Sequence, residues 1–170
     1  MLDVTKTLSG IPEDAYGEHY SAHILEMWKT YLEMTDRISD RRERANVFFV
    51  TLHTGVFAVV GFLVEKQMFP WIVTICLLAG IPFSYLWYRL VRSYRDLNSA
   101  KFKVVHAIET RLPLKLFDAE WEAVGRGKDR SRYLPFTHIE LKVPLVFIGV
   151  YGFLTIAALY FVYSTGAAPA

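Results

Sequence analysis

Three polar side chains, Thr51, His53 and Thr54, interrupt a run of the sequence that is otherwise almost wholly apolar. A histidine ring both donates and accepts hydrogen bonds, so it can line an ion path or join two helices. If the run crosses a bilayer, these side chains must face protein or water, because a polar group in lipid is costly. We therefore expect either a pore-lining role or an interhelical hydrogen bond, for example from His53 to Thr74 or Ser84 or to a neighbouring subunit.

The remaining chemical signals are weak. His19 and His23 have the i, i+4 spacing of a metal pair, but no third ligand is evident, although Glu18 and Glu26 lie near. No phosphate loop, HExxH or GxSxG motif is present, and the spans hold no paired carboxylates and no nucleophile–base set. The single cysteine, Cys76, has no partner for an intrachain disulfide and fits an apolar packing role. We expect no enzyme activity, no cofactor and no metal.

The distribution of charge decides the class of protein. Three windows contain no Asp, Glu, Lys or Arg, namely Ala45–Val64, Met68–Tyr88 and Val143–Ala170. Each is long enough to cross a hydrocarbon core of about 30 Å at about 1.5 Å per helical residue. The first twenty residues lack a basic start followed by an apolar core, so we expect the internal spans to direct insertion. The sequence predicts an all-α integral membrane protein with three transmembrane helices.

The predicted organisation follows from these windows. We expect a cytoplasmic amphipathic helix in residues 1–45 and a transmembrane hairpin in 46–91, with spans 47–64 and 69–88. A cytoplasmic helical segment follows in 92–142, then a third span in 143–163 and an external tail in 164–170. Pro82 should kink the second span. Aromatic residues near the span ends are typical of an interfacial belt: Trp71, Trp87, Tyr88, Tyr160 and Tyr163.

Basic residues orient the chain. Lys and Arg number six before the first span, one in the hairpin, twelve between the second and third spans, and none after the third. The positive-inside rule therefore predicts a cytoplasmic N-terminus and an external C-terminus. Arginines beside the spans are candidate contacts for lipid headgroups: Arg41, Arg42, Arg44, Arg89 and Arg92. These charges suit a membrane surface, and we expect no nucleic-acid partner.

Two stretches outside the spans have an apolar stripe at helical spacing. The first stripe alternates steps of four and three residues, which is typical of a coiled-coil seam and equally of an amphipathic helix packed on its own chain. The second lies after the second span. Together they give the candidate oligomer contacts: Tyr20, Ile24, Met27, Tyr31, Ile38, Leu97, Val104 and Ile108.

The segments SYRDLNSAKFKVVHAIETRLPLKLFDAEW and YLPFTHIELKVP, with WKTYLEMTDRISDRRERANVFFVTLHT before them, resemble the RipA-like family of small bacterial inner-membrane proteins, which are described as octameric. The similarity spans roughly residues 28–163. It implies three spans, a cytoplasmic helical region, ring-like assembly and a bacterial inner-membrane location. It supplies no catalytic residue.

Two functions remain open at this point. The first is a homo-oligomeric pore, channel-like conduit or membrane effector, with a role in stress or defence. The alternative is a non-conducting scaffold or stress-adaptation factor, whose ring is plugged by lipid and whose basic cytoplasmic face recruits a protein partner. In the conduit, Thr51, His53 and Thr54 would face the central axis or a subunit interface.

Overall fold

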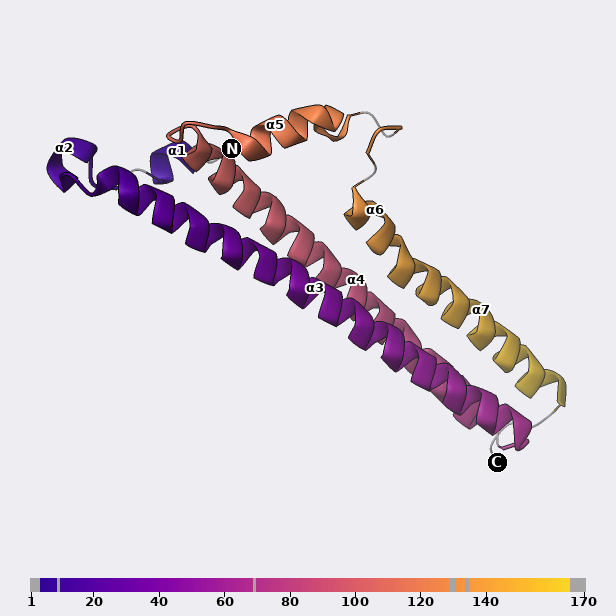
Figure 1. Cartoon of the computed structure of the whole chain (residues 1–170). Coiled ribbons are helices and arrows are strands. Elements are labelled where there is room, and N and C mark those ends of the chain that lie inside the picture. Colours follow the sequence, from indigo (N-terminus) through magenta and orange to yellow (C-terminus); the bar gives the residue numbers. More distant parts are fainter. Residues whose placement is uncertain (1–3, 9, 69, 129–130, 134, 166–170) are drawn as a thin grey trace. The chain divides into compact units, whose positions relative to one another are not determined.

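The computed structural model describes residues 4–8, 10–68, 70–128, 131–133 and 135–165, and every regular element among them is helical. The elements are α1 (Val4–Thr7), α2 (Glu13–Tyr16), α3 (Tyr20–Glu65), α4 (Pro70–Glu109), α5 (Leu116–Ala123), the 3₁₀ turn η1 (Gly125–Gly127), α6 (Phe136–Glu140) and α7 (Lys142–Thr165) (Figure 1). Contacts divide the chain into two compact units. We call residues 42–93 with 136–170 the membrane unit, and residues 1–41 with 94–135 the extramembrane unit.

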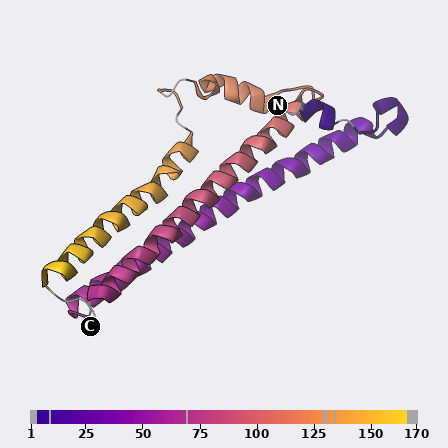
Figure 2. The same ribbon diagram turned by 180° about the vertical axis from the view of Figure 1, so that it is seen from behind.

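Three helical stretches are long and apolar enough to cross a membrane, Tyr20–Glu65, Pro70–Glu109 and Phe136–Thr165. Within the membrane unit, α7 runs alongside α3 and α4, as both views show (Figure 2). Apolar side chains of all three helices pack against one another in two clusters, one around Leu77 and Tyr151 and one around Phe49, Trp87 and Val91. The membrane unit is therefore a three-helix bundle.

α3 is one continuous helix where the sequence predicted an amphipathic helix and a separate first span. α4 continues from the second span into the segment after it. Neither junction contains a helix breaker, since Asp40–Arg44 and Arg89–Arg95 contain neither Gly nor Pro. The expected kink at Pro82 does not interrupt the helix: Pro82 lies inside α4, which continues to Glu109.

The hairpin between α3 and α4 is short. α3 ends at Glu65, and Gln67 adopts a positive φ of 50° in the turn. Pro70 opens α4, a position where its missing N–H loses no hydrogen bond. Phe69, the first residue of the predicted second span, and residues 166–170 of the predicted external tail lie outside the described residues.

In the extramembrane unit, the last residue of α4 fixes the start of α5. The Glu109 carboxylate is fully buried and accepts the backbone N–H of Phe117 at 2.8 Å and of Asp118 at 3.3 Å. These amides belong to the first turn of α5 and have no partner inside the helix, so the carboxylate caps it. The Phe117 ring then packs edge-on against Phe102 of α4 and Trp28 of α3. The Trp121 ring of α5 contacts Tyr133 edge-on, with 6.3 Å between ring centroids.

Candidate functional site: a buried polar cluster among three spans

His53 is fully buried at the centre of the membrane unit. Its Nδ1 lies 2.9 Å from the Tyr151 hydroxyl of α7, and its Nε2 lies 3.4 Å from Ser84 Oγ of α4. Ser84 donates its own hydroxyl proton to the Gly80 carbonyl at 2.9 Å. The serine oxygen is therefore an acceptor toward His53, which favours the tautomer with the proton on Nε2 and leaves Nδ1 to accept from Tyr151. One imidazole thus joins all three spans.

Aromatic rings enclose the imidazole. The Phe147 ring stacks at 4.7 Å between centroids and the Trp87 ring at 5.8 Å, while Tyr151 is tilted at 5.4 Å. Phe57 stacks on Tyr151 at 4.9 Å from the outer side. These rings surround His53, and its two ring nitrogens are directed to Tyr151 and Ser84.

Gly80 makes the close approach of α7 possible. A Cβ built at Gly80 would overlap the Tyr151 ring, so any other residue here would force α7 away from α4. Small residues commonly allow such close packing between membrane helices. The hydrogen bond from Tyr151 to His53 therefore depends on a missing side chain on a third helix.

A second polar group of the membrane unit lies nearer the N-terminal ends of α6 and α7. Asn46 donates to Glu140 Oε1 at 2.9 Å and accepts from Trp87 Nε1 at 2.8 Å. The Arg42 Nε lies 3.5 Å from Glu140 Oε2, and both side chains are mostly buried. Arg42 also reaches Thr137 at 3.5 Å. The carboxylate is thus neutralised by a buried arginine, and α3, α4 and α6 are linked at this level as well.

The other two candidate pore residues lie elsewhere on α3. Thr51 and Thr54 are both exposed on the protomer, and the Thr54 hydroxyl donates to the Val50 carbonyl at 2.9 Å. Thr74, a suggested partner of His53, donates to the Pro70 carbonyl instead. The structure therefore brings His53 together with Ser84 and separates it from Thr51 and Thr54.

The candidate headgroup arginines differ in their surroundings. Arg41, Arg44, Arg89 and Arg92 are exposed, whereas Arg42 is held by Glu140 inside the protomer.

The candidate oligomer contacts differ in how far they are exposed on the protomer. Met27 and Leu97 are exposed, Ile38 is buried, and the rest are half-buried: Tyr20, Ile24, Tyr31, Val104 and Ile108.

Several residues of the cluster were missed from sequence. Trp87 was assigned to an interfacial belt, but it is buried as the donor to Asn46. Tyr151 could not be identified from the sequence, because a single tyrosine in an apolar run forms no spacing pattern with other polar residues. Glu140 could not be singled out from the sequence, because its partner Arg42 lies 98 positions earlier and the pair leaves no local pattern.

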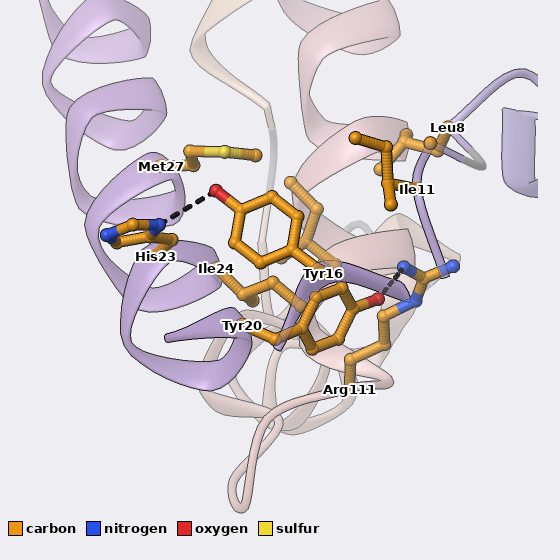
Figure 3. A pocket seen from close by; sticks show the side chains of 10 residues that line it. Leu8, Ile11, Tyr16, Tyr20, His23, Ile24, Met27 and Arg111 are labelled. Atoms are coloured by element: carbon orange, nitrogen blue, oxygen red, sulfur yellow. Dashed lines mark hydrogen bonds between the residues drawn. The ribbon is translucent and has the colours of Figure 1, made fainter. Parts of the chain in front are cut away.

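A small cavity lies in the extramembrane unit, at the end of α3 beside α1 and α2. It encloses about 200 Å³ between apolar side chains that include Ile24, Met27 and Ile108. Tyr16 and His23 share a hydrogen bond of 2.8 Å at its edge, and Arg111 donates to Tyr20 at 3.2 Å (Figure 3). His23 is thus engaged by Tyr16 while its ring stacks on His19.

No group of three or more His, Cys, Asp or Glu side chains suited to a metal ion occurs among the described residues.

A family model described as "Octameric membrane protein family (8xMP)" matches residues 25–160, most of the chain. The chain belongs to the octameric membrane protein family. Membership in this family confirms the similarity to octameric membrane proteins that the sequence indicated. The narrower assignment to the RipA-like family stays a prediction. No curated protein and no solved structure matches the chain.

Family membership and the three apolar helices together establish an oligomeric, multi-pass membrane protein. The polar cluster can then be interpreted for one subunit of such an assembly. Its hydrogen bonds link α3 to α7 and α4 through His53, and α3 to α6 and α4 through Asn46.

Proposed function

We propose that the chain is the subunit of a homo-octameric scaffold in a bacterial inner membrane, and that the assembly neither conducts ions nor catalyses a reaction. One observation carries this proposal: His53, the only ionisable residue inside the first charge-free window, is buried among helices of its own protomer. A residue in that position holds its own bundle together, which supports a structural role over a place in a path between subunits. The basic segment after α4 remains the surface for a cytoplasmic protein partner.

A conduit is the second candidate, because Thr51 and Thr54 lie on an exposed side of α3. If that side faced the axis of a ring, the two threonines would be its polar lining. His53→Ala is a poor test, since loss of a buried imidazole would disturb folding whichever function is correct. Thr51 and Thr54 are better probes because substitutions there leave the core of the bundle intact.

The test is conductance of the purified octamer in planar bilayers, with lipid alone as the baseline. The scaffold predicts no current above that baseline for the wild-type protein. Discrete conductance steps that change in size in Thr51→Val or Thr54→Val would overturn the scaffold and support the conduit. As a matched control, Thr74→Val alters a buried threonine and should leave any such steps unchanged.

A further inference from the structure

The part of α3 outside the membrane unit has two sides of different chemistry. Met27, Met34 and Arg41 are spaced seven residues apart and therefore share one side of the helix. Met27 is 65% exposed and Met34 is 49% exposed, which is unusual for large apolar side chains in a segment rich in charge. The protomer alone leaves Met27 and Met34 largely exposed.

α4 continues the same surface. Leu97, Val104 and Arg111 are again seven residues apart, and Leu97 is 48% exposed. Two contacts fix the antiparallel register: Lys101 lies over the Tyr31 ring at 4.8 Å, and Arg111 reaches the Tyr20 hydroxyl. This register brings Leu97 level with Met34.

Met27 and Arg111 also line one cavity, so both rows lie on the same flank of the α3–α4 pair (Figure 3). We call these six residues the apolar–basic face. It holds three apolar side chains and two arginines, with the half-buried Val104 between them, and no carboxylate. Because α5 packs on α3 and α4 through Trp28 and Phe102, on the other flank, it cannot cover this face.

The opposite side of α3 is acidic. Glu33, Asp36 and Asp40 have the spacing i, i+3, i+7 and are all exposed. Asp36 stands two positions after Met34, a separation that places the two side chains on different sides of a helix. We call these three residues the acidic face. The only ion pair found for them among the described residues joins Glu33 to Arg37 at 3.9 Å, on an exposed part of the helix.

We propose that neighbouring subunits join head to tail through the extramembrane unit, with the apolar–basic face of one copy packed on the acidic face of the next. A ring requires two different surfaces on each subunit, and these two faces lie on different sides of α3 with complementary charge. Burial of Met27, Met34 and Leu97 would supply most of the affinity, while the charges fix the register. The inference rests only on self-association and is independent of whether the octamer conducts.

Two charge-reversed variants test the proposal. Variant A carries Glu33→Lys, Asp36→Lys and Asp40→Lys, and variant B carries Met34→Glu, Arg41→Glu and Arg111→Glu. Each variant alone has two faces of like charge, so we expect loss of the octamer in light scattering of the detergent-solubilised protein. Co-expressed with different tags, A and B should purify together as an octamer, because each face of A meets an opposite face of B.

Helix content by circular dichroism identifies variants that fail to fold, and Glu120→Lys is the matched control. Glu120 is an exposed carboxylate on α5 and belongs to neither face, so reversing its charge should leave the octamer intact. Octamers of A alone or of B alone would overturn the proposal, as would an A and B mixture that folds but stays dissociated. A monomeric wild type would overturn the assembly itself, and with it the proposed scaffold.

Discussion

At the residue scale, the imidazole of His53 links α3 to Tyr151 of α7 and to Ser84 of α4, so one side chain connects the three spans. Its position away from lipid follows from the sequence, but its main partner does not. The rule that polar side chains in a span face protein or water needs only the composition of the run. Tyr151 could not be found in this way, because the register of α7 against the hairpin depends on close packing at Gly80, and packing of helices far apart in sequence has no local signal. Trp87 shows the same limit, since an interfacial tryptophan and a buried donor have identical spacing.

The hydroxyl of Tyr151 should measurably stabilise the bundle. Tyr151→Phe keeps the ring stacking on Phe57 but leaves His53 Nδ1 buried without a partner, which should lower the free energy of unfolding by about 1–3 kcal/mol. Thermal unfolding in detergent, followed by circular dichroism, measures the change. Tyr160 also lies on α7 but is 72% exposed, so Tyr160→Phe should unfold at the wild-type temperature. Equal behaviour of the two variants would contradict the role given to the hydrogen bond.

Gly80 should tolerate no side chain. Gly80→Ala introduces a methyl group where the Tyr151 ring lies, and we expect about 1–3 kcal/mol of destabilisation from overpacking. Gly61 on α3 has open space around it, so Gly61→Ala should be neutral or stabilising by up to about 1 kcal/mol. The same unfolding measurement distinguishes the two, and a harmless Gly80→Ala would show that α7 does not approach α4 this closely.

At the scale of elements, the charge-free windows identified the apolar spans. The ends of the helices depend instead on helix-breaking residues and on capping side chains. The absence of Gly and Pro at Asp40–Arg44 lets α3 run through the predicted start of the first span, and Arg89–Arg95 likewise contains nothing that would end α4. The start of α5 could not be predicted, since its cap is the side chain of Glu109 and not a residue at the helix terminus.

The cap on α5 gives a local prediction. Glu109→Gln removes the negative charge that faces the first turn of α5, and we expect a loss of about 1 kcal/mol in the stability of that helix. Amide hydrogen exchange at Phe117 and Asp118 should accelerate, while exchange in the membrane unit stays unchanged. Glu120→Gln alters an exposed carboxylate on α5 and serves as the control. Unchanged protection at Phe117 would rule out the cap.

At the scale of the whole molecule, the orientation in the membrane remains a prediction from the basic residues. In a Cys76→Ala background, Gln67→Cys should react with a membrane-impermeant maleimide added to intact cells. Lys115→Cys should react only after the membrane is permeabilised, because the positive-inside rule puts it in the cytoplasm. Labelling of Lys115→Cys in intact cells would show that the chain has the opposite orientation in the membrane. The two faces of the proposed subunit contact would then lie outside the cell.

The long sequence separation between the partners in the membrane unit has a consequence for biogenesis. Tyr151 follows His53 by 98 positions and Glu140 follows Asn46 by 94. At about 5–20 residues per second, a ribosome needs roughly 5–20 s to synthesise the partner of His53. During that time the hairpin holds unsatisfied polar groups, which makes it a natural client for an insertase or a membrane chaperone. Nascent chains that stop before α7 should therefore be retained and degraded, because the final helix completes the hydrogen bonding of the first two.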